Sequence, residues 1–323
     1  MADVQPTIAV LTSGGDAPGM NAAVRSVVRS TIAAGGKSLG IEHGFEGLLE
    51  SRFRPLALGD VGGILDRGGT FLGTSRSERF ETPEGVAEAA ALLAEQGVTG
   101  LVIVGGDGSY RGAEALHATG VQVVGVPGTI DNDVAGTDTS IGFDTALNTI
   151  CDAMGKVRDT ASSHERTFVI EVMGRSCGIL ATYAGLACGG DCILVPEVPW
   201  DIVDVWECVT SGVARGKKHS IIIVAEGAGH AFGIAAELSE RYGHEVRSVV
   251  LGHVQRGGSP SAFDRILASR MGARAVDSLL GGESGVAVGL RGSRTLTYPL
   301  KDAYEAQHEL RREIYQLART LAR

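Results

Sequence analysis

The chain has 323 residues, of which 44% are hydrophobic and 21% are charged, and its formal net charge at pH 7 is −9. This length exceeds the usual size of one hydrophobic core, so we expect two domains. The acidic balance argues against a general nucleic-acid or anionic-membrane surface, although a local basic pocket for a small anion is still allowed. The composition is typical of a globular enzyme and not of a fibrous or disordered chain.

The five cysteines are an odd number without a Cys-x-x-Cys pair. This argues against a disulfide framework or a zinc ribbon, and we expect reduced, mostly buried thiols. The first residues lack the basic and apolar regions of a signal peptide, and no apolar run approaches the ~18 residues of a membrane span. We therefore expect a cytosolic protein.

The first predicted elements are a strand over 7–11, a loop with three glycines over 12–21 and a helix over 22–33. Glycines allow a phosphate to approach the backbone closely, and the start of the helix offers free N–H groups. A tight turn between strand and helix explains the same pattern, so both interpretations stay open.

The triplet Gly36-Lys37-Ser38 invites comparison with the phosphate-binding loop of nucleotide hydrolases. That pattern requires a glycine at position 31, where this chain has Thr31. We assign the triplet to a turn at the end of a helix.

Turns and short helices alternate over 41–66, and the loop over 67–76 then contains two arginines among glycines. Arginine there could bind phosphate oxygens with two parallel hydrogen bonds. A helix is predicted over 83–96, with Pro83 in its first turn and Gly97 as its stop.

Two further strands are each followed by a polar loop. A strand over 101–104 leads to Gly105-Gly106-Asp107-Gly108-Ser109, and a strand over 121–126 leads to Pro127-Gly128-Thr129-Ile130-Asp131-Asn132-Asp133. Two carboxylates so close repel each other unless a cation, a proton or a substrate hydroxyl separates them. A surface turn rich in Asp and Asn is the structural alternative, but the repeated pattern favours a reaction centre at the carboxyl end of a parallel sheet.

The spacing Gly106-x-Gly108-x-x-x-Gly112 is similar to a loosened dinucleotide fingerprint. In that fold a ribose-binding acid ends the second strand, whereas Asp131 lies beyond a Pro-Gly break. A nucleoside triphosphate fits better, because Asp107 can hold Mg²⁺ beside the phosphates.

The rest of the chain continues to alternate helices and strands, which specifies an α/β protein with parallel sheets. A dense basic stretch over 215–219 is assigned to a solvated helix end. His253, Gln255 and Arg256 follow a strand and precede a helix, which favours a phosphate pocket. The predicted elements are helices over 142–160 and 302–323, a long helix after Pro260, and strands over 168–171, 192–195, 220–225 and 247–252.

Several of these motifs, in this order, resemble those of the bacterial 6-phosphofructokinases. They are Thr12-Ser13-Gly14-Gly15-Asp16-Ala17-Pro18-Gly19-Met20-Asn21, the loops over 105–109 and 127–133, Met173-Gly174-Arg175, and Gly252-His253-Val254-Gln255-Arg256-Gly257-Gly258. The resemblance implies two similar three-layer α/β domains with largely parallel sheets and an active-site cleft between them. Residues 1–141 with 254–304 would bind ATP, and residues 142–253 with 305–323 would bind the sugar phosphate.

The resemblance also implies the reaction: transfer of the γ-phosphate of MgATP to the 1-hydroxyl of fructose 6-phosphate, which gives fructose 1,6-bisphosphate and ADP in glycolysis. Asp131 matches the acid that takes the hydroxyl proton, Thr129 and Asp133 flank the reaction centre, Asp107 matches the magnesium-binding acid, and Arg175 is expected to meet the transferring phosphoryl group. The remaining nucleotide positions are Gly15, Arg76, Ser77, Gly106, Gly108 and Ser109. The remaining sugar-phosphate positions are Met173, Gly174, Glu226, His253 and Arg256.

Arg166 and Arg247 match arginines that reach into a neighbouring subunit's sugar site, so the resemblance implies a homotetramer. Pyrophosphate-using members tend to have aspartate at the position of Gly108 and lysine at the position of Gly128, so the two glycines favour ATP. However, the sequences over 142–146 and 225–228 look more like the pyrophosphate-using branch. A pyrophosphate-dependent phosphotransferase therefore remains the alternative.

Regulation is the last point of resemblance. Asp191 and a set of basic residues match positions that bind an anionic effector such as phosphoenolpyruvate or ADP, but Leu58 replaces an arginine of that set, so the sign of control stays open. The basic residues are Arg25, Arg29, Arg158, Arg215, Lys217 and Lys218. A non-enzymatic nucleotide sensor is a further alternative, and the presence of Asp131, Asp133 and Arg175 argues against it.

Overall fold

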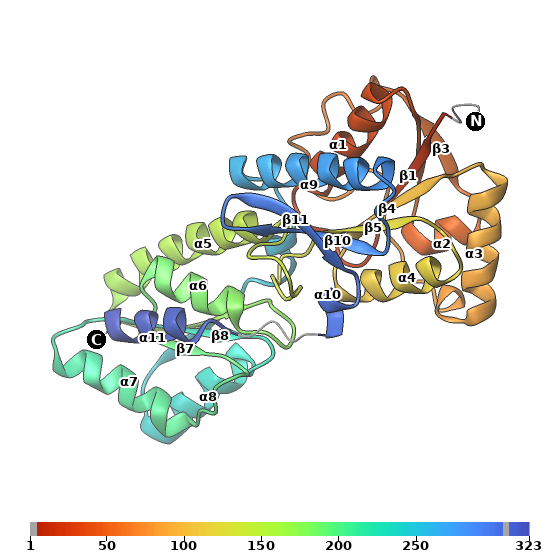
Figure 1. The fold of residues 1–323 in the computed structure, drawn as a ribbon. Coiled ribbons are helices and arrows are strands. Elements are labelled where there is room, and N and C mark those ends of the chain that lie inside the picture. The colour runs from red at the N-terminus through yellow and green to blue at the C-terminus, as the bar shows by residue number, and fades with distance from the viewer. Residues whose placement is uncertain (1–4, 306–309, 323) are drawn as a thin grey trace. The chain divides into compact units, whose positions relative to one another are not determined.

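The computed structural model describes residues 5–305 and 310–322, and these form two compact units (Figure 1). Within the described residues, the first unit consists of 5–145 with 256–305, and the second of 146–255 with 310–322. Each unit is thus made of two separate segments of the chain. We describe each unit by itself.

The first unit contains a seven-stranded sheet in the order β11-β10-β5-β4-β1-β2-β3. Neighbouring strands from β10 to β2 are parallel, while the edge strands β3 and β11 are antiparallel to their neighbours. The central strands read as continuous apolar runs because both of their faces are covered. The strands are β1 (Thr7–Thr12), β2 (Lys37–Ile41), β3 (Phe53–Leu56), β4 (Gly100–Gly105), β5 (Val123–Pro127), β10 (Val286–Arg291) and β11 (Arg294–Pro299).

Helices cover both faces of this sheet (Figure 1). On one face α1 (Met20–Ala33) packs on α9 (Ala262–Leu280), and the two backbones approach closely, since a Cβ on Gly272 would lie 2.7 Å from the Ala23 carbonyl oxygen. The other face is covered by α2 (Gly44–Leu49), α3 (Pro83–Glu95), α4 (Asp107–Ala118) and α10 (Asp302–Glu305), whose apolar side chains share one core with the sheet. The 3-10 helix η1 (Arg79–Glu81) precedes α3.

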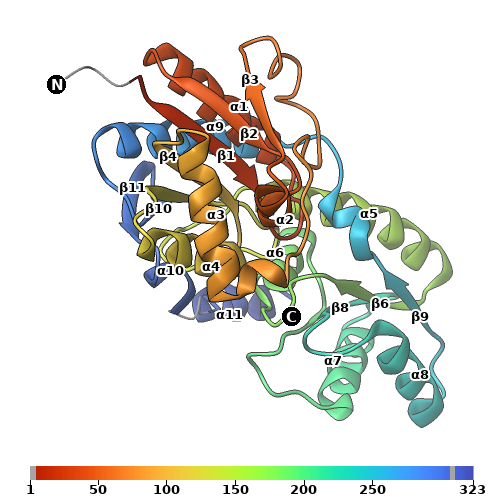
Figure 2. The same ribbon diagram turned by 90° about the vertical axis from the view of Figure 1, so that its right-hand side faces the viewer.

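The second unit has a four-stranded, all-parallel sheet in the order β7-β8-β6-β9. Helices α7 and α8 lie on one face of it (Figure 2) and share an apolar core with its strands, and α11 packs on α6. The strands are β6 (Thr167–Val172), β7 (Cys192–Leu194), β8 (Ser220–Ala225) and β9 (Val246–Val250). The helices are α6 (Ile179–Cys188), α7 (Ile202–Ala214), α8 (Ala231–Tyr242) and α11 (Arg312–Leu321), together with α5 (Phe143–His164) from residue 146 on and η2 (Gly252–Arg256) without its last residue.

The predicted α/β class with largely parallel sheets is confirmed. Four strands were not predicted: β2, β3, β10 and β11. The turn assigned to Gly36-Lys37-Ser38 is wrong in its second half, because β2 begins at Lys37. A strand and not a helix therefore follows the triplet, which agrees with rejecting a phosphate-binding loop there.

The single C-terminal helix over 302–323 is also wrong. Leu310 and Arg311 are not helical and separate α11 from α10, while residues 306–309 and 323 lie outside the described part of the chain. All five cysteines are free thiols, but only Cys177 is buried, so the expectation of mostly buried thiols is wrong. Within the described residues, we find no helix with the length and apolar character that a membrane crossing requires.

Candidate active site

Three loops of the first unit contain most of the predicted nucleotide and catalytic residues. They follow β1, β4 and β5, which are adjacent and parallel, so their carboxyl ends lie at one edge of the sheet. A Cβ on Gly14 would lie 3.6 Å from Ser109 Oγ, and one on Gly106 would lie 3.7 Å from Thr129 Cβ. The glycine loops and the acidic loop are therefore direct neighbours.

The acidic loop after β5 is buried and internally hydrogen-bonded. Asp131 is only 2% exposed, and its backbone N–H donates to Thr129 Oγ1 at 3.2 Å. The Thr129 hydroxyl in turn donates to Asp131 Oδ2 at 3.4 Å. Asn132 has φ 55°, a left-handed conformation that Asn tolerates better than most residues, and its side-chain oxygen accepts the N–H of Ser140 at 2.7 Å. The buried Asp131 is thus held by contacts within its own loop.

The loop after β4 runs directly into a helix. Gly106 is the N-cap of α4, and Asp107, Gly108 and Ser109 form its first turn, where backbone N–H groups and the helix dipole favour an anion. The Asp107 carboxylate is partly exposed and accepts a 3.3 Å hydrogen bond from Arg111 one turn later. A Cβ on Gly108 would meet no atom within 4 Å, so open space lies above this turn.

Two further positions lie against these loops. A Cβ on Gly15 would lie 2.3 Å from Arg256 Nη1, and this guanidinium donates to the Asp16 carbonyl at 3.3 Å. A side chain at position 15 would therefore displace the Arg256 guanidinium from its place beside this loop. Thr74 Oγ1 donates to the Gly14 carbonyl at 2.8 Å, which ties the loop that contains the exposed Arg76 and the half-buried Ser77 to the first glycine loop.

In the second unit, the loop after β6 contains Met173, Gly174 and Arg175. Glu226, which follows β8, accepts through Oε1 the backbone N–H of Gly174 at 3.2 Å and that of Arg175 at 2.7 Å. Arg175 has φ 53° and an exposed side chain. The carboxylate of Glu226 therefore holds the backbone of the predicted phosphoryl-binding arginine.

Two buried residues near these loops make backbone contacts that the sequence did not predict, although Gln255 was predicted to be part of a phosphate pocket. The fully buried Gln255 accepts the N–H of Met173 through Oε1 at 3.2 Å, next to the exposed His253. Gln255 belongs to the motif over 252–258, and this motif was the sequence feature that indicated its importance. Asp264, also fully buried, accepts the N–H of Gly142 at 3.0 Å and that of Thr145 at 2.8 Å, and no sequence pattern marked it.

Arg166 and Arg247 are not brought near the Met173–Arg175 loop. They lie at the amino ends of β6 and β9, so the six residues of β6, ~17 Å of strand, separate Arg166 from that loop. Both form ion pairs with Glu245, at 3.6 Å for Arg166.

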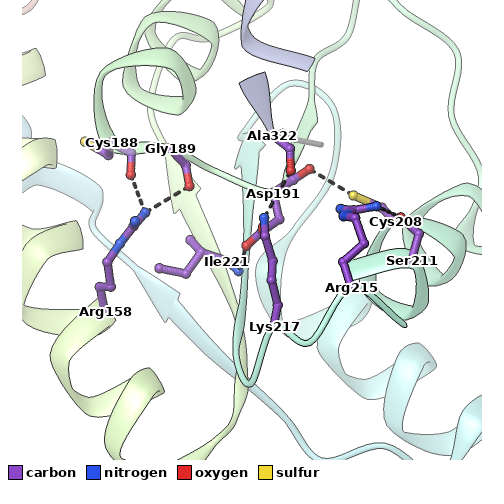
Figure 3. Close-up of polar contacts among 10 residues, drawn as sticks. All are labelled: Arg158, Cys188, Gly189, Asp191, Cys208, Ser211, Arg215, Lys217, Ile221 and Ala322. Atoms are coloured by element: carbon purple, nitrogen blue, oxygen red, sulfur yellow. Dashed lines mark hydrogen bonds and ion pairs between the residues drawn. The ribbon is translucent and has the colours of Figure 1, made fainter. Parts of the chain in front are cut away.

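Several residues of the second unit that match the family's effector-binding positions form hydrogen bonds with other residues of that unit (Figure 3). Lys217 forms an ion pair with the largely buried Asp191 and donates to the Ala322 carbonyl at 3.0 Å. Arg215 donates to Ser211 Oγ at 2.8 Å. Asp191 and Arg215 also line a cavity of about 540 Å³, together with residues of α7 and α11.

The fold and the site define an α/β protein whose strand-end glycine loops suit a phosphate ligand. A family model described as phosphofructokinase matches residues 7–279. The chain is 52% identical to the ATP-dependent 6-phosphofructokinase of Halalkalibacterium halodurans, over 98% of this chain and 99% of that protein. It is 53% identical, with the same coverage, to the protein of that name from Listeria welshimeri. The chain belongs to the phosphofructokinase family.

Solved structures agree with the fold. The phosphofructokinase of Saccharomyces cerevisiae matches with a TM-score of 0.90 and 37% identity, over 98% of this chain and 48% of that chain. A pyrophosphate-dependent phosphofructokinase from Marinobacter aquaeolei matches with a TM-score of 0.85 over 97% of this chain and 91% of that one. Its identity is 21%, so this second likeness concerns the fold alone.

Proposed function

We propose that the protein is an ATP-dependent 6-phosphofructokinase, which phosphorylates fructose 6-phosphate at its 1-hydroxyl with MgATP and yields fructose 1,6-bisphosphate and ADP. The observation that carries the proposal is 52–53% identity over 98% of the chain with relatives named for this activity. The buried acidic loop at the carboxyl end of β5 supports it, because this chemistry needs a positioned base beside a phosphate-binding loop.

Asp131 acts as the general base in this proposal. Its carboxylate is buried and oriented by Thr129, so it can accept the proton of the sugar hydroxyl as the O–P bond forms. Thr129 and Asp133 flank the reacting groups. Arg175, whose backbone is held by Glu226, stabilises negative charge on the transferring phosphoryl group.

The residues present fit a magnesium ion held chiefly by the nucleotide. Among the residues that the structure describes, no group of three or more His, Cys, Asp or Glu could hold a metal. Mg²⁺ in such enzymes takes one or two carboxylates, and phosphate and water oxygens complete its shell. Asp107, partly exposed at the start of α4, would supply that carboxylate. When bound, the ion neutralises charge on the phosphates.

The phosphoryl donor we propose is ATP. Gly15, Arg76, Ser77, Gly106, Gly108 and Ser109 would contact the nucleotide. A Cβ on Gly108 would meet no atom within 4 Å, so no side chain narrows the space at this turn. A side chain at Gly128 would begin 3.0 Å from Val104 Cγ1 and 3.1 Å from Met20 Cε, so the lysine of pyrophosphate-using members would not fit without displacing core atoms.

We propose that residues of the first unit bind the nucleotide and that Met173, Gly174, Glu226 and His253 of the second unit bind the sugar phosphate. Arg256, which belongs to the first unit, is the remaining predicted sugar-phosphate residue. The ion pairs of Arg166 and Arg247 with Glu245, at the other edge of the β6 sheet, are compatible with a role toward a neighbouring subunit in a homotetramer. A cytoplasmic location stays a prediction.

We also propose an anionic effector such as phosphoenolpyruvate or ADP. Its ligands in the second unit would be Arg158, Arg215, Lys217 and Lys218, and Arg25 and Arg29 of α1 match further positions of the family's effector set. Leu58 is 47% exposed and cannot supply the charge of the arginine it replaces. We therefore expect a weaker or altered response.

The first experiment compares ATP with pyrophosphate as donors in initial-rate assays with Mg²⁺ and fructose 6-phosphate. The proposal expects turnover with ATP and at most a trace with pyrophosphate. Turnover with pyrophosphate alone would show that glycine at 108 and 128 does not decide the donor. No turnover with either donor, from a folded protein, would overturn the proposed function.

A further inference from the structure

Two cysteines of the second unit face each other outside the proposed active site. Cys151 lies in α5 and Cys188 is the last residue of α6, and their Sγ atoms are 2.9 Å apart. A disulfide bond is about 2.05 Å long, so the sulfur atoms need to approach by less than about 1 Å. Both side chains are partly exposed, which gives a small oxidant access.

The surroundings make the two thiols unequal. The Cys188 thiol donates its hydrogen bond to the sulfur of Cys151, and this bond lowers the pKa of Cys151 to about 7, although burial acts in the opposite direction. The same bond raises the pKa of Cys188. Arg158 donates to the carbonyl oxygens of Cys188 and Gly189, the latter at 2.9 Å, so a cation lies beside the main chain of Cys188 (Figure 3). Cys151 is therefore the nucleophile and Cys188 the resolving thiol.

We propose that Cys151 and Cys188 form a reversible intramolecular disulfide bond when the protein meets a hydroperoxide. The Cys151 thiolate attacks the terminal oxygen of the hydroperoxide, an S–O bond forms as the O–O bond breaks, and the alkoxide, or hydroxide in the case of hydrogen peroxide, leaves and is protonated to an alcohol or to water. Cys188 sulfur then attacks the sulfenic acid sulfur, the S–S bond forms as the S–O bond breaks, and the leaving hydroxide takes the Cys188 proton. The sum is two thiols and one hydroperoxide giving one disulfide, one water and one alcohol, or two waters for hydrogen peroxide.

The new bond would join α5 to the end of α6. The two residues are 37 positions apart, and a crosslink over a loop of that size restricts the unfolded chain. The loop contains β6 and the Met173–Arg175 segment that leads into α6. Oxidation is therefore expected to raise the melting temperature of the protein, and a thiol reductant should reverse the change.

The test oxidises the full-length protein with a small molar excess of hydrogen peroxide and maps linked peptides without reduction. Trypsin separates Cys151 from the other four cysteines, which share the fragment 176–215. Proteases that cut before Asp191 and after Tyr183 then separate Cys188 from Cys192 and from Cys177. Melting curves are recorded for the oxidised and the re-reduced protein.

Cys188→Ser is the test variant and Cys208→Ser the matched control. Cys208 donates to the Asp191 carbonyl at 2.9 Å, and a serine hydroxyl can donate to the same oxygen. We expect a Cys151–Cys188 peptide, lighter by about 2 Da than the two separate peptides for the two hydrogens lost, in the wild type and in Cys208→Ser. We expect neither this peptide nor the rise in melting temperature in Cys188→Ser.

Linkage of Cys151 to any other cysteine in the wild type would overturn the proposal. So would recovery of both thiols unchanged, or of Cys151 only as sulfinic acid, after the peroxide has been consumed. The mapping does not depend on catalytic turnover, so failure here is distinct from failure of the proposed function.

Discussion

Glu226 Oε1 accepts the backbone N–H of Arg175 at 2.7 Å and that of Gly174 at 3.2 Å, and thereby fixes an arginine whose φ is 53°. We expect Glu226→Ala to lower kcat/KM by about 10- to 100-fold, because a hydrogen bond to a charged acceptor contributes about 1.5–3 kcal/mol. Steady-state kinetics with varied fructose 6-phosphate checks this.

Glu226→Gln keeps one carbonyl acceptor and should recover most of that loss. This variant therefore distinguishes a role of Glu226 in orienting the Arg175 backbone from an effect of its negative charge alone. Glu240→Ala, an exposed carboxylate of α8, is the matched control. Wild-type kinetics in Glu226→Ala would mean that Arg175 is positioned by other contacts.

The proposed base gives the second prediction. Asp131→Asn keeps the size of the side chain and its contact with Thr129 but cannot accept the sugar proton. We expect kcat to fall by ~10²–10⁴-fold, with KM for fructose 6-phosphate little changed. A variant that turns over at near the wild-type rate would remove Asp131 from the role of base.

The start of α4 gives the third prediction. Gly108→Asp has open space for its side chain, so the protein should fold normally, but its carboxylate would repel the phosphates of ATP. We expect KM for ATP to rise by about 10-fold, equivalent to about 1.4 kcal/mol. Gly108→Asn has nearly the same volume without the charge, so an equal rise in that variant would point to volume and not to charge.

Asp264 gives a prediction on pH. Burial raises the pKa of this carboxyl above its ordinary value of 3.8, although hydrogen bonds from Thr145 and Gly142 act in the opposite direction. A native pKa above the unfolded one means that the native state binds the proton more tightly. The stability from this proton is fully present below pH 3.8 and is lost as the pH rises through the native pKa.

The free energy of unfolding of Asp264→Asn, compared with that of the wild type, tests this. The amide NH₂ would face the Thr145 donors, so we expect a loss of about 1–3 kcal/mol near pH 4. This difference should shrink as the pH rises from 4 and level off above the native pKa. Urea unfolding at several pH values measures it, and a difference independent of pH would contradict the prediction.

Lys217 gives the fifth prediction, which rests on the proposed effector. Its ammonium group is paired with Asp191, whose side chain is 12% exposed. We expect Lys217→Ala to need about 10-fold more phosphoenolpyruvate or ADP for half of the wild-type response, as for a contact of about 1.4 kcal/mol. The rate without effector should not change. Lys156→Ala, an exposed lysine paired with Asp152, is the control, and equal effects in both would contradict a specific role.

The sequence predicted the elements whose local pattern agrees with their final surroundings. Val123–Pro127 and Gly100–Gly105 are buried on both faces, so their apolar runs needed no knowledge of the rest of the fold. β2 was missed because it mixes Lys37, Ser38 and Gly40 with apolar residues. A Cβ on Gly40 would lie 2.8 Å from side-chain atoms of Leu56 and Leu72, so this strand is specified by packing partners distant in sequence.

The candidate site also contains some features that local sequence predicts and others that depend on residues distant in the chain. Loops at strand ends were found because glycine and aspartate clusters are local signals, and their roles came from resemblance to a family. Asp264 accepts hydrogen bonds from Gly142 and Thr145, more than one hundred positions earlier in the chain. No window of sequence contains that relationship. Leu310 and Arg311 are not helical although the amphipathic helix α11 follows them directly, and helix propensity alone did not indicate this break.

The order of strands has a consequence for synthesis on the ribosome. β5 has β4 as one neighbour, and the other is β10, which is translated only after residues 146–255 of the second unit. Until then the nascent chain presents an apolar strand edge with open backbone hydrogen-bonding groups, the kind of surface that chains use to associate wrongly. The second unit is also incomplete at that stage, because α11, which packs on α6, follows β10 and β11 in the chain. Neither unit can be completed until its second segment, which starts after residue 255 in both cases, has emerged.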